Sequence, residues 1–157
     1  MKTDIGISEK NLKNVSSLLS VALSDEMTLY VKTRKAHWNV TGESFMELHR
    51  LFEEHYKQLE MAIDEIAERI GKLGQKTIGT MSEFSKLSNL KEYPGKYSSS
   101  KDILKELLKD HETIIKELRK NIEDCQDKYE DAGTTDFLTG LMEGHETIAW
   151  ILRRYID

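Results

Sequence analysis

The chain has 157 residues, of which 32% are charged and 38% hydrophobic, and its formal net charge is −5. This length can bury the core of one domain, and the presence of only one proline favours helices. The negative charge argues against a general nucleic-acid binder, whose affinity comes from neutralising phosphates. No apolar run reaches the roughly 20 residues of a membrane span, no signal peptide is visible, and the only cysteine is Cys125. We therefore expect a cytoplasmic protein of one domain, residues 1–157, without an intrachain disulfide or a membrane contact.

The first predicted helix follows a short leader, residues 1–7, which we expect to be flexible. Ser8 is a suitable N-cap, and after it apolar residues recur at the three- and four-residue spacing of one helix face. The helix should reach about Ala36. A turn at residues 39–42, which contains Asn, Thr and Gly, separates it from the next helix.

The second predicted helix spans residues 44–70 and has one apolar side. Beside that side, at about 100° per residue, a strip about 100° wide contains His49, Glu53, Asp64 and Glu68. Histidine nitrogen together with carboxylate oxygen suits a divalent first-row metal such as iron, zinc or manganese. An ordinary solvated edge of the helix is the alternative interpretation of this strip.

The two halves of this strip are too far apart to bind one metal ion. Eleven residues separate Glu53 from Asp64, which is roughly 16 Å along the helix axis at about 1.5 Å per residue. A second copy of the helix, antiparallel about a two-fold axis, would place Asp64 and Glu68 opposite His49 and Glu53 of the first copy. The spacing therefore predicts two equivalent metal sites at the interface of a symmetric dimer.

Residues 75–99 form the one long irregular segment of the sequence, and a short helix is predicted within it at residues 81–87. A connection of about 25 residues is long for a compact domain. In a helical bundle it indicates a crossover along the length of the bundle, so that the second and third long helices run parallel.

The last two long helices are bounded by small polar residues. Ser99 or Ser100 should cap the third long helix, and Gly133 should break it. Thr134 or Thr135 should then cap the fourth. Four long helices with one crossover predict an all-α fold, a ferritin-like four-helix bundle.

Other histidines give no recognisable metal motif. No acidic residue lies three positions before any of the five histidines, so the Glu-x-x-His pair of di-iron bundles is missing and a site between chains is favoured. His111 and His145 lie within apolar stripes and are interpreted as core or interface residues. His55, which we place on the polar side of the second helix, and Cys125 have no assigned role.

His37 lies near the end of the first predicted helix, twelve residues before His49. If the first two helices are antiparallel, His37 can lie near the first turns of the second helix and close to His49. Trp38 would then be a near neighbour of the metal site. It is either a plain core residue or an aromatic group that quenches a stray radical.

The chain resembles the Dps family (DNA-binding proteins from starved cells, or mini-ferritins) over nearly its whole length, in AHWNVTG, ELHRLFEE, AIDEIAERI and TTDFLTGLMEGHETIAWILR. The resemblance implies a hollow shell of twelve identical subunits that oxidises Fe(II), preferably with hydrogen peroxide, and stores ferric mineral. It implies ferroxidase centres that combine His37 and His49 of one subunit with Asp64 and Glu68 of the partner subunit. Glu53 stands where the best-known members have Asp. Iron is the expected metal, and zinc or manganese can occupy the same site.

The resemblance also implies acidic pores at three-fold axes, formed by the start of the fourth long helix. Asp136 and Glu143 lie on one face there, and Asp131 is nearby. A ring of carboxylates at such a pore would draw in cations. The alternative is that these acids only complement the positive end of the helix dipole.

Family members that condense DNA typically use a tail rich in Lys and Arg. Here the leader is mixed in charge and the chain ends soon after the last helix, so we expect weak or absent DNA binding. Two alternatives to an iron-oxidising store remain at this point. One is a nucleoid-compacting protein with secondary ferroxidase activity, and the other is a non-catalytic helical scaffold.

Overall fold

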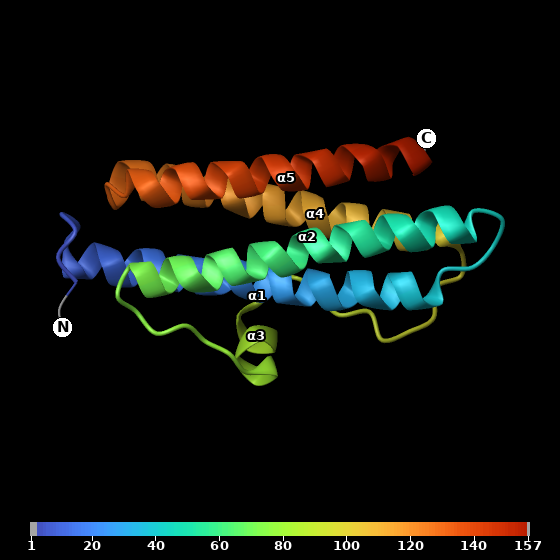
Figure 1. Ribbon diagram of the computed structural model, residues 1–157, viewed down its shortest axis with the longest axis horizontal. Helices are drawn as coiled ribbons and strands as arrows, with labels where there is room; N and C mark the ends of the chain where they lie inside the picture. The colour runs from blue at the N-terminus through green and yellow to red at the C-terminus, as the bar shows by residue number, and fades with distance from the viewer. Residues whose placement is uncertain (1–2, 157) are drawn as a thin grey trace.

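The computed structural model describes residues 3–156, and Figure 1 shows its helices. The long helices lie side by side and are α1 (Glu9–Asn39), α2 (Phe45–Lys72), α4 (Ser100–Glu123) and α5 (Ala132–Ile156). A short helix, α3 (Met81–Leu87), packs against α1, and a π-helical segment, η1 (Asp124–Lys128), continues α4. Between residues 3 and 156 there is no strand, and no helix is long and apolar enough to cross a membrane. Part of the predicted leader, residues 1–2, lies outside the described range.

The crossover between α2 and α4 makes these two helices run in the same direction, as predicted (Figure 1). α1 packs along α2, and α4 packs along α5, so that two helical hairpins face each other. The core between them is lined by Leu, Ile and Phe side chains such as Leu23, Phe52, Ile114 and Leu152, each at most 3% exposed. Burial of one such side chain stabilises the fold by about 1.5–3 kcal/mol.

The ends of the first two helices follow local signals in the sequence. The Ser8 hydroxyl accepts a hydrogen bond from the backbone N–H of Asn11 at 3.2 Å and so caps α1. α1 continues beyond the predicted end at Ala36 to Asn39, because Ala36 still accepts a backbone hydrogen bond from the residue after Asn39. The turn that follows contains Gly42 with φ +105°, a conformation that favours glycine.

The start of α5 differs from the prediction. The helix begins at Ala132, and Asp131 rather than Thr134 or Thr135 caps it, because an Asp131 Oδ1 atom accepts the backbone N–H of Thr134 at 2.9 Å. Glu130, just before, takes φ 53° and reverses the chain direction. The predicted break after α4 therefore lies earlier than expected.

Gly133 lies inside the first turn of α5 and does not break a helix. A Cβ atom at this position would lie 2.8 Å from Nη2 of Arg69. The same Nη2 forms an ion pair with Asp131 at 3.0 Å. The glycine therefore serves close packing of α2 against the start of α5, and a sequence pattern alone does not distinguish that from a turn.

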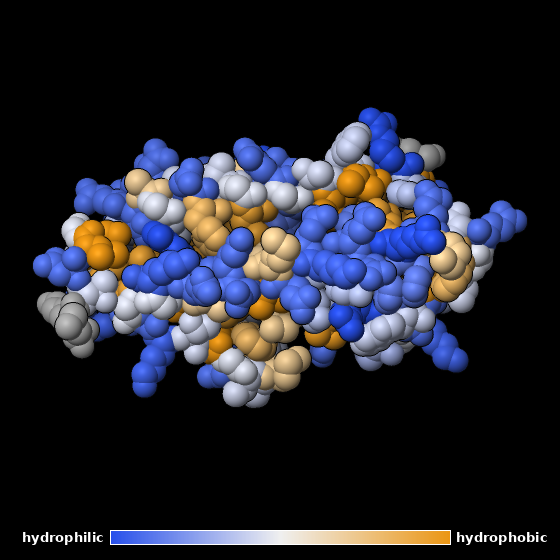
Figure 2. All heavy atoms as spheres, viewed as in Figure 1, coloured by the Kyte–Doolittle hydropathy of each residue, from blue (hydrophilic) through white to orange (hydrophobic). Residues whose placement is uncertain are grey.

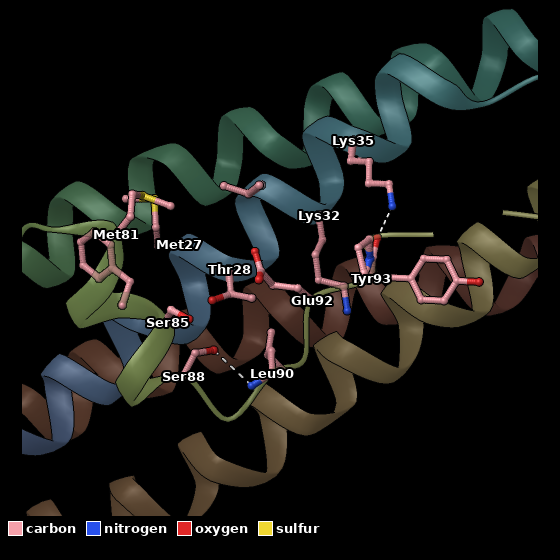
Figure 3. A pocket seen from close by; sticks show the side chains of 13 residues that line it. Met27, Thr28, Lys32, Lys35, Met81, Ser85, Ser88, Leu90, Glu92 and Tyr93 are labelled. Carbon is pink, nitrogen blue, oxygen red and sulfur yellow. Dashed lines mark hydrogen bonds between the residues drawn. The ribbon is translucent and has the colours of Figure 1, made fainter. Parts of the chain in front are cut away.

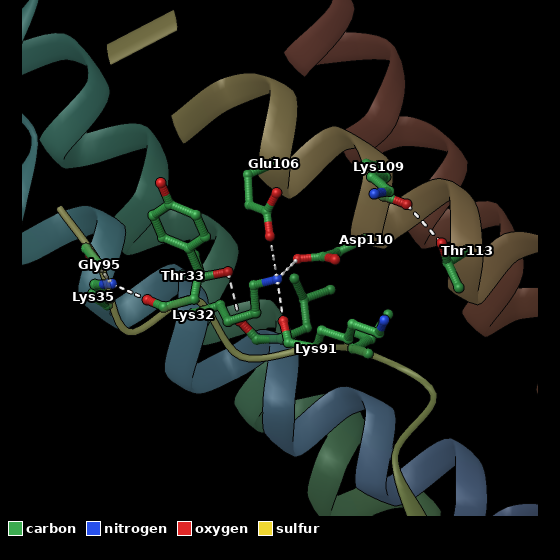
Figure 4. Close-up of polar contacts among 12 residues, drawn as sticks. Lys32, Thr33, Lys35, Lys91, Gly95, Glu106, Lys109, Asp110 and Thr113 are labelled. Carbon is green, nitrogen blue, oxygen red and sulfur yellow. Dashed lines mark hydrogen bonds and ion pairs between the residues drawn. The ribbon is translucent and has the colours of Figure 1, made fainter. Parts of the chain in front are cut away.

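The crossover is fastened to α1 by Lys32, which is only 4% exposed. Its Nζ donates hydrogen bonds to the Lys91 carbonyl and the Glu106 carboxylate, both at 2.8 Å, and pairs with Asp110 at 2.5 Å (Figure 4). Burial raises the pKa of Asp110, although Lys32 opposes this shift. Lys32 thus ties α1, the crossover and α4 together.

A second lysine anchors the end of the crossover, beside a surface groove. Lys35 Nζ donates hydrogen bonds to the carbonyls of Tyr93 and Gly95, the latter at 2.7 Å. The groove, of about 320 Å³, lies between α1, α3 and the crossover, and Met27 and Met81 line its apolar end (Figure 3). The crossover is therefore held on the α1 side of the bundle along its length.

Candidate metal centre

The junction of α1 and α2 brings His37 and His49 face to face. Their imidazole rings are stacked, with centroids 3.7 Å apart and planes 18° apart. His37 Nδ1 lies 2.7 Å from the His49 carbonyl oxygen, and His49 Nδ1 lies 2.8 Å from the His37 carbonyl oxygen. A carbonyl only accepts, so both Nδ1 atoms carry a proton, and each ring in its neutral form has its lone pair on Nε2. Two nitrogen ligands are therefore oriented before any metal arrives.

Glu53 lies one helical turn after His49 and adds a carboxylate beside the histidine pair. It forms an ion pair with Lys57, one further turn along α2, at 2.6 Å. The hydrogen bond and charge of Lys57 lower the pKa of Glu53, and smaller charge effects from His37 and His49 act in the same direction. Glu53 is thus ionised at neutral pH, and a metal ion would compete with Lys57 for it.

Asp64 and Glu68 are exposed farther along α2, and Glu68 pairs with Lys72 at 3.3 Å. Asp64 follows His49 by fifteen residues, which is roughly 22 Å along the helix axis. Among residues 3–156, no three His, Cys, Asp or Glu side chains are grouped so that they could hold a metal ion. The structure therefore pairs His37 with His49, places Glu53 one helical turn after His49, and leaves the two acids of the second half apart from them in the same chain.

Aromatic and cationic side chains border the histidine pair. Trp38 is 63% exposed, so within this chain it is not a core residue. The Arg34 guanidinium lies 4.3 Å from the ring centre of Tyr56 and 5.3 Å from that of Trp38. Tyr56 is in turn edge-on to His37, with ring centres 5.3 Å apart. An aromatic layer therefore connects the histidine pair to the surface.

The three acids predicted at a pore have different environments. Asp136 and Glu143 are exposed on α5. Asp131 is only 2% exposed, and its carboxylate is engaged by Arg69 and by the start of α5. Asp131 therefore caps α5 inside the chain, and its place at a pore stays a prediction.

A second polar cluster, formed by Glu26, His55, His111 and His145, lies in the bundle core with one residue from each long helix; we call it the core histidine cluster. All four residues are at most 2% exposed. His145 Nε2 lies 2.6 Å from a Glu26 carboxylate oxygen, and the Nδ1 atoms of His145 and His111 are 2.8 Å apart. Both ring nitrogens of His55 and the second Glu26 oxygen have no hydrogen-bond partner.

Burial keeps His55 and His111 neutral, and the position of His55 corrects one prediction. It lowers the pKa of His55 to about 4 and that of His111 well below its ordinary value, so both are neutral at pH 7. His111 and His145 are buried, as their apolar sequence surroundings indicate. His55 is also buried and not on a polar side of α2, and Glu26 received no role although it interrupts the apolar stripe of α1. A carboxylate inside such a stripe was the signal that could have revealed the cluster.

The sequence has close relatives along nearly its full length. Residues 16–157 match a family model described as a ferritin-like domain. An uncharacterised low temperature-induced protein of Nostoc sp. is 45% identical over 156 residues, which cover 99% of this chain and 87% of that protein. The DNA protection during starvation protein 2 of Bacillus anthracis is 34% identical over 92% of this chain and 98% of its own length.

Solved structures share the fold. A Dps protein of Vibrio cholerae O1, described as a member of a broad superfamily of ferritin-like diiron-carboxylate proteins, superposes with a TM-score of 0.92 at 27% identity and covers 100% of this chain and 98% of its own. DpsC of Streptomyces coelicolor superposes with a TM-score of 0.95 at 25% identity, over 100% of this chain and 91% of its own. The four-helix arrangement and the crossover helix are therefore common to these proteins.

Proposed function

Because the chain belongs to the Dps family of ferritin-like proteins, we propose that it oxidises Fe(II) at sites shared between two subunits and stores the ferric product. Membership of this family supports iron storage and protection in general. The observation that carries the specific proposal is the pair formed by His37 and His49. Their two lone pairs are oriented by backbone carbonyls beside the ionised carboxylate of Glu53.

We infer a shared site because one chain does not bring all of its predicted metal ligands together. His37, His49 and Glu53 supply two nitrogen atoms and one carboxylate, and the donor set of carboxylate with a few imidazoles fits iron. Asp64 and Glu68 are exposed on the same helix and make no contact with that half-site in their own chain. An antiparallel two-fold contact of α2 with its copy completes two equivalent sites in each dimer.

The proposed reaction treats Fe(II) and hydrogen peroxide as substrates. Two Fe(II) ions supply the two electrons that, with two protons, convert one hydrogen peroxide into two water molecules and leave two Fe(III) ions. Hard carboxylate oxygens stabilise the product, Fe(III), and thus favour its formation. Because both electrons reach the same peroxide, no hydroxyl radical is released, and both reactants of the Fenton reaction are consumed.

We also propose the assembly and the surroundings in which this site works. Twelve copies form a hollow shell in the cytoplasm, and the exposed acids Asp136 and Glu143 line pores through which Fe(II) enters. The net charge of −5 makes tight binding to DNA unfavourable. Protection of DNA then comes from removal of iron and peroxide. A gel-shift assay at low and moderate salt distinguishes this indirect protection from a nucleoid-compacting role, which requires DNA binding.

The decisive experiment loads the anaerobic protein with Fe(II) and adds one pulse of hydrogen peroxide. We expect fast growth of ferric absorbance without trapped hydroxyl radical in the wild type, and loss of both features in a His37→Ala/His49→Ala variant. Size-exclusion chromatography must show the same assembly for both proteins, and Lys13→Ala, which changes an exposed ion pair elsewhere, serves as the control. Slow oxidation that is equal in wild type and double variant would contradict the site and leave the scaffold or DNA-binding interpretation.

A further inference from the structure

The core histidine cluster contains polar groups that the fold itself does not satisfy. His55 is 2% exposed, and neither of its ring nitrogens has a hydrogen-bond partner. A buried polar group that has lost its water without gaining a partner is disfavoured, and such groups in native proteins call for a physical explanation such as a bound ion. The interface site does not use any member of this cluster.

The protons within the cluster can be assigned from its contacts. The Glu26 carboxylate accepts the proton on His145 Nε2 at 2.6 Å, so His145 Nδ1 carries the lone pair. Nδ1 of His111 lies 2.8 Å from that atom and donates to it. A histidine that binds a metal through one nitrogen while it donates the other N–H to a carboxylate is a common arrangement in metal proteins.

The two facing nitrogen atoms lie near the spacing that a metal ion requires. Two ligands at about 2.1 Å from one ion are roughly 3.0–3.4 Å apart at octahedral or tetrahedral angles. For a metal ion to bind both Nδ1 atoms, the proton on His111 Nδ1 moves to Nε2 of the same ring, so that the imidazole stays neutral. The two rings then separate by a few tenths of an ångström and turn until both lone pairs point at the ion. Glu26 would keep its hydrogen bond to His145 throughout.

The third imidazole is close but not yet aimed at the same point. The ring of His55 is centred 6.5 Å from that of His111, at an interplanar angle of 73°. As they stand, the described side chains do not surround a common point. Since His55 has no hydrogen bond to break, its ring can turn toward the other two without losing a contact of that kind.

An open groove leads from the surface to this cluster. It has a volume of about 420 Å³, runs between α2 and α5, and includes His145 in its lining. Gly140 and Gly144 also line the groove, and a Cβ atom on either glycine would meet nothing within 4 Å, so there is free space beside both. Figure 2 shows hydrophobic side chains exposed along the line between α2 and α5. The groove thus borders the cluster at His145, which is itself only 2% exposed.

We propose that the bundle core holds a metal site separate from the interface site, in which His55, His111 and His145 bind one divalent transition-metal ion and Glu26 orients His145. Three neutral imidazoles favour Zn²⁺, Fe²⁺ or Co²⁺ over Mg²⁺ and Ca²⁺. Three histidines with an open fourth position also form a well-known zinc donor set. The proposal does not depend on ferroxidase activity, because none of its ligands belongs to the half-site at His37 and His49.

Co²⁺ is the probe for this site, because it absorbs strongly in the visible range only when it is four- or five-coordinate. The parent protein for the titration carries His37→Ala/His49→Ala, which disables the interface site, and is kept assembled and anaerobic. We expect a visible band that saturates at one Co²⁺ per chain and a higher melting temperature with Zn²⁺. If no band develops in the parent protein, the proposal is overturned.

His55→Leu in the same parent is the sharpest variant, because leucine removes a ligand without leaving a partner unsatisfied. We expect it to fold, to lose the Co²⁺ band and to lose the Zn²⁺-dependent rise in melting temperature. Glu26→Gln should weaken Co²⁺ binding by roughly 10- to 100-fold while the site remains. Ser16→Ala, which replaces another buried polar group without a partner, should leave the band unchanged. A band that persists in His55→Leu shows that this residue is no ligand and refutes the three-histidine site.

Discussion

His37 and His49 hold each other in one tautomer: each ring donates its Nδ1 proton to the backbone carbonyl of the other residue, at 2.7 and 2.8 Å. The pair therefore depends on the antiparallel contact of α1 with α2 and not on either helix alone. It presents two nitrogen lone pairs, while the exposed acids Asp64 and Glu68 lie too far along α2 to join them. This division of ligands leads to the first prediction.

Subunits that lack different halves of the site should complement each other. Co-expressed chains carrying His37→Ala/His49→Ala and chains carrying Asp64→Asn/Glu68→Gln form mixed dimers, in which one of two sites regains all its ligands. With random pairing we expect about a quarter of the wild-type rate of Fe(II) oxidation. Each variant alone should be inactive, and stopped-flow ferric absorbance measures all three proteins.

The complementation result distinguishes a shared site from a site within one chain. If all ligands acted within one subunit, every chain in the mixture would still lack half of its site, and mixing would restore nothing. Tags of different size on the two chains allow mixed assemblies to be isolated, so that absence of mixing is not mistaken for absence of complementation.

Lys57 controls the availability of Glu53, because it is the main cause of the lowered pKa of that carboxyl. In Lys57→Met we expect metal binding at pH 7 to become roughly two- to fivefold tighter, since the metal no longer competes with an ion pair. At pH 5 the gain should shrink, because the pKa of Glu53 rises toward its ordinary value and more of the carboxyl is protonated. Calorimetric Co²⁺ titrations at both pH values test this.

The exposed pair of Lys13 and Glu9 on α1 supplies a matched control for the Lys57 experiment. Lys13→Met also removes one positive charge but lies away from the metal ligands, so its affinity for Co²⁺ should equal that of the wild type at both pH values. An equal increase in both variants would indicate a general charge effect and contradict the role assigned to Lys57.

Lys32 should be among the most important polar residues for stability, since it is 4% exposed and neutralises Asp110 in the core. In Lys32→Met we expect a loss of about 3–5 kcal/mol in the free energy of unfolding, because a buried carboxylate is left without its partner. The pKa of Asp110, already raised by burial, should rise further, so the loss should be larger at pH 8 than at pH 5. Urea unfolding at both pH values measures it.

A second variant separates the buried charge from the loss of packing. Lys32→Met/Asp110→Leu removes both charged groups, and we expect it to regain most of the lost stability and to lose the added pH dependence. A double variant no more stable than Lys32→Met would show that the hydrogen bond from Lys32 to the Lys91 carbonyl matters more than the buried charge.

His55 should make the metal-free protein sensitive to acid. Burial lowers its pKa from 6.5 to about 4, so the unfolded chain binds the proton more readily than the folded one. The contribution of neutral His55 to the free energy of unfolding is therefore fully present above about pH 6.5. The free energy of unfolding then falls by roughly 3 kcal/mol as the pH decreases through 4. In His55→Leu this part of the pH dependence should disappear, as measured by urea unfolding with a chelator present. Curves that run parallel for both proteins from pH 7 to 4 would contradict it.

Helix periodicity was sufficient for the predicted bundle, the crossover and the relation of His49 to Glu53. Helix periodicity also places His55 near the core face. His55 follows Leu48 by seven residues and precedes Ile66 by eleven, so that it lies roughly 20° from each around the helix axis. The prediction that His55 lies on the polar side is wrong, because its wheel position borders the core and the residue is 2% exposed. Angular position on a helix predicts burial even where polarity argues against it.

Local sequence patterns were enough to predict the helices, their order and the spacing that separates His49 and Glu53 from Asp64 and Glu68, because these depend on contacts between residues close in the chain. Tertiary packing sets the tautomers of His37 and His49 and the grouping of Glu26 with three buried histidines in the core. It also decided why Gly133 is tolerated in a helix. These features depend on the distance between atoms of different helices, which is set by how side chains far apart in the sequence pack.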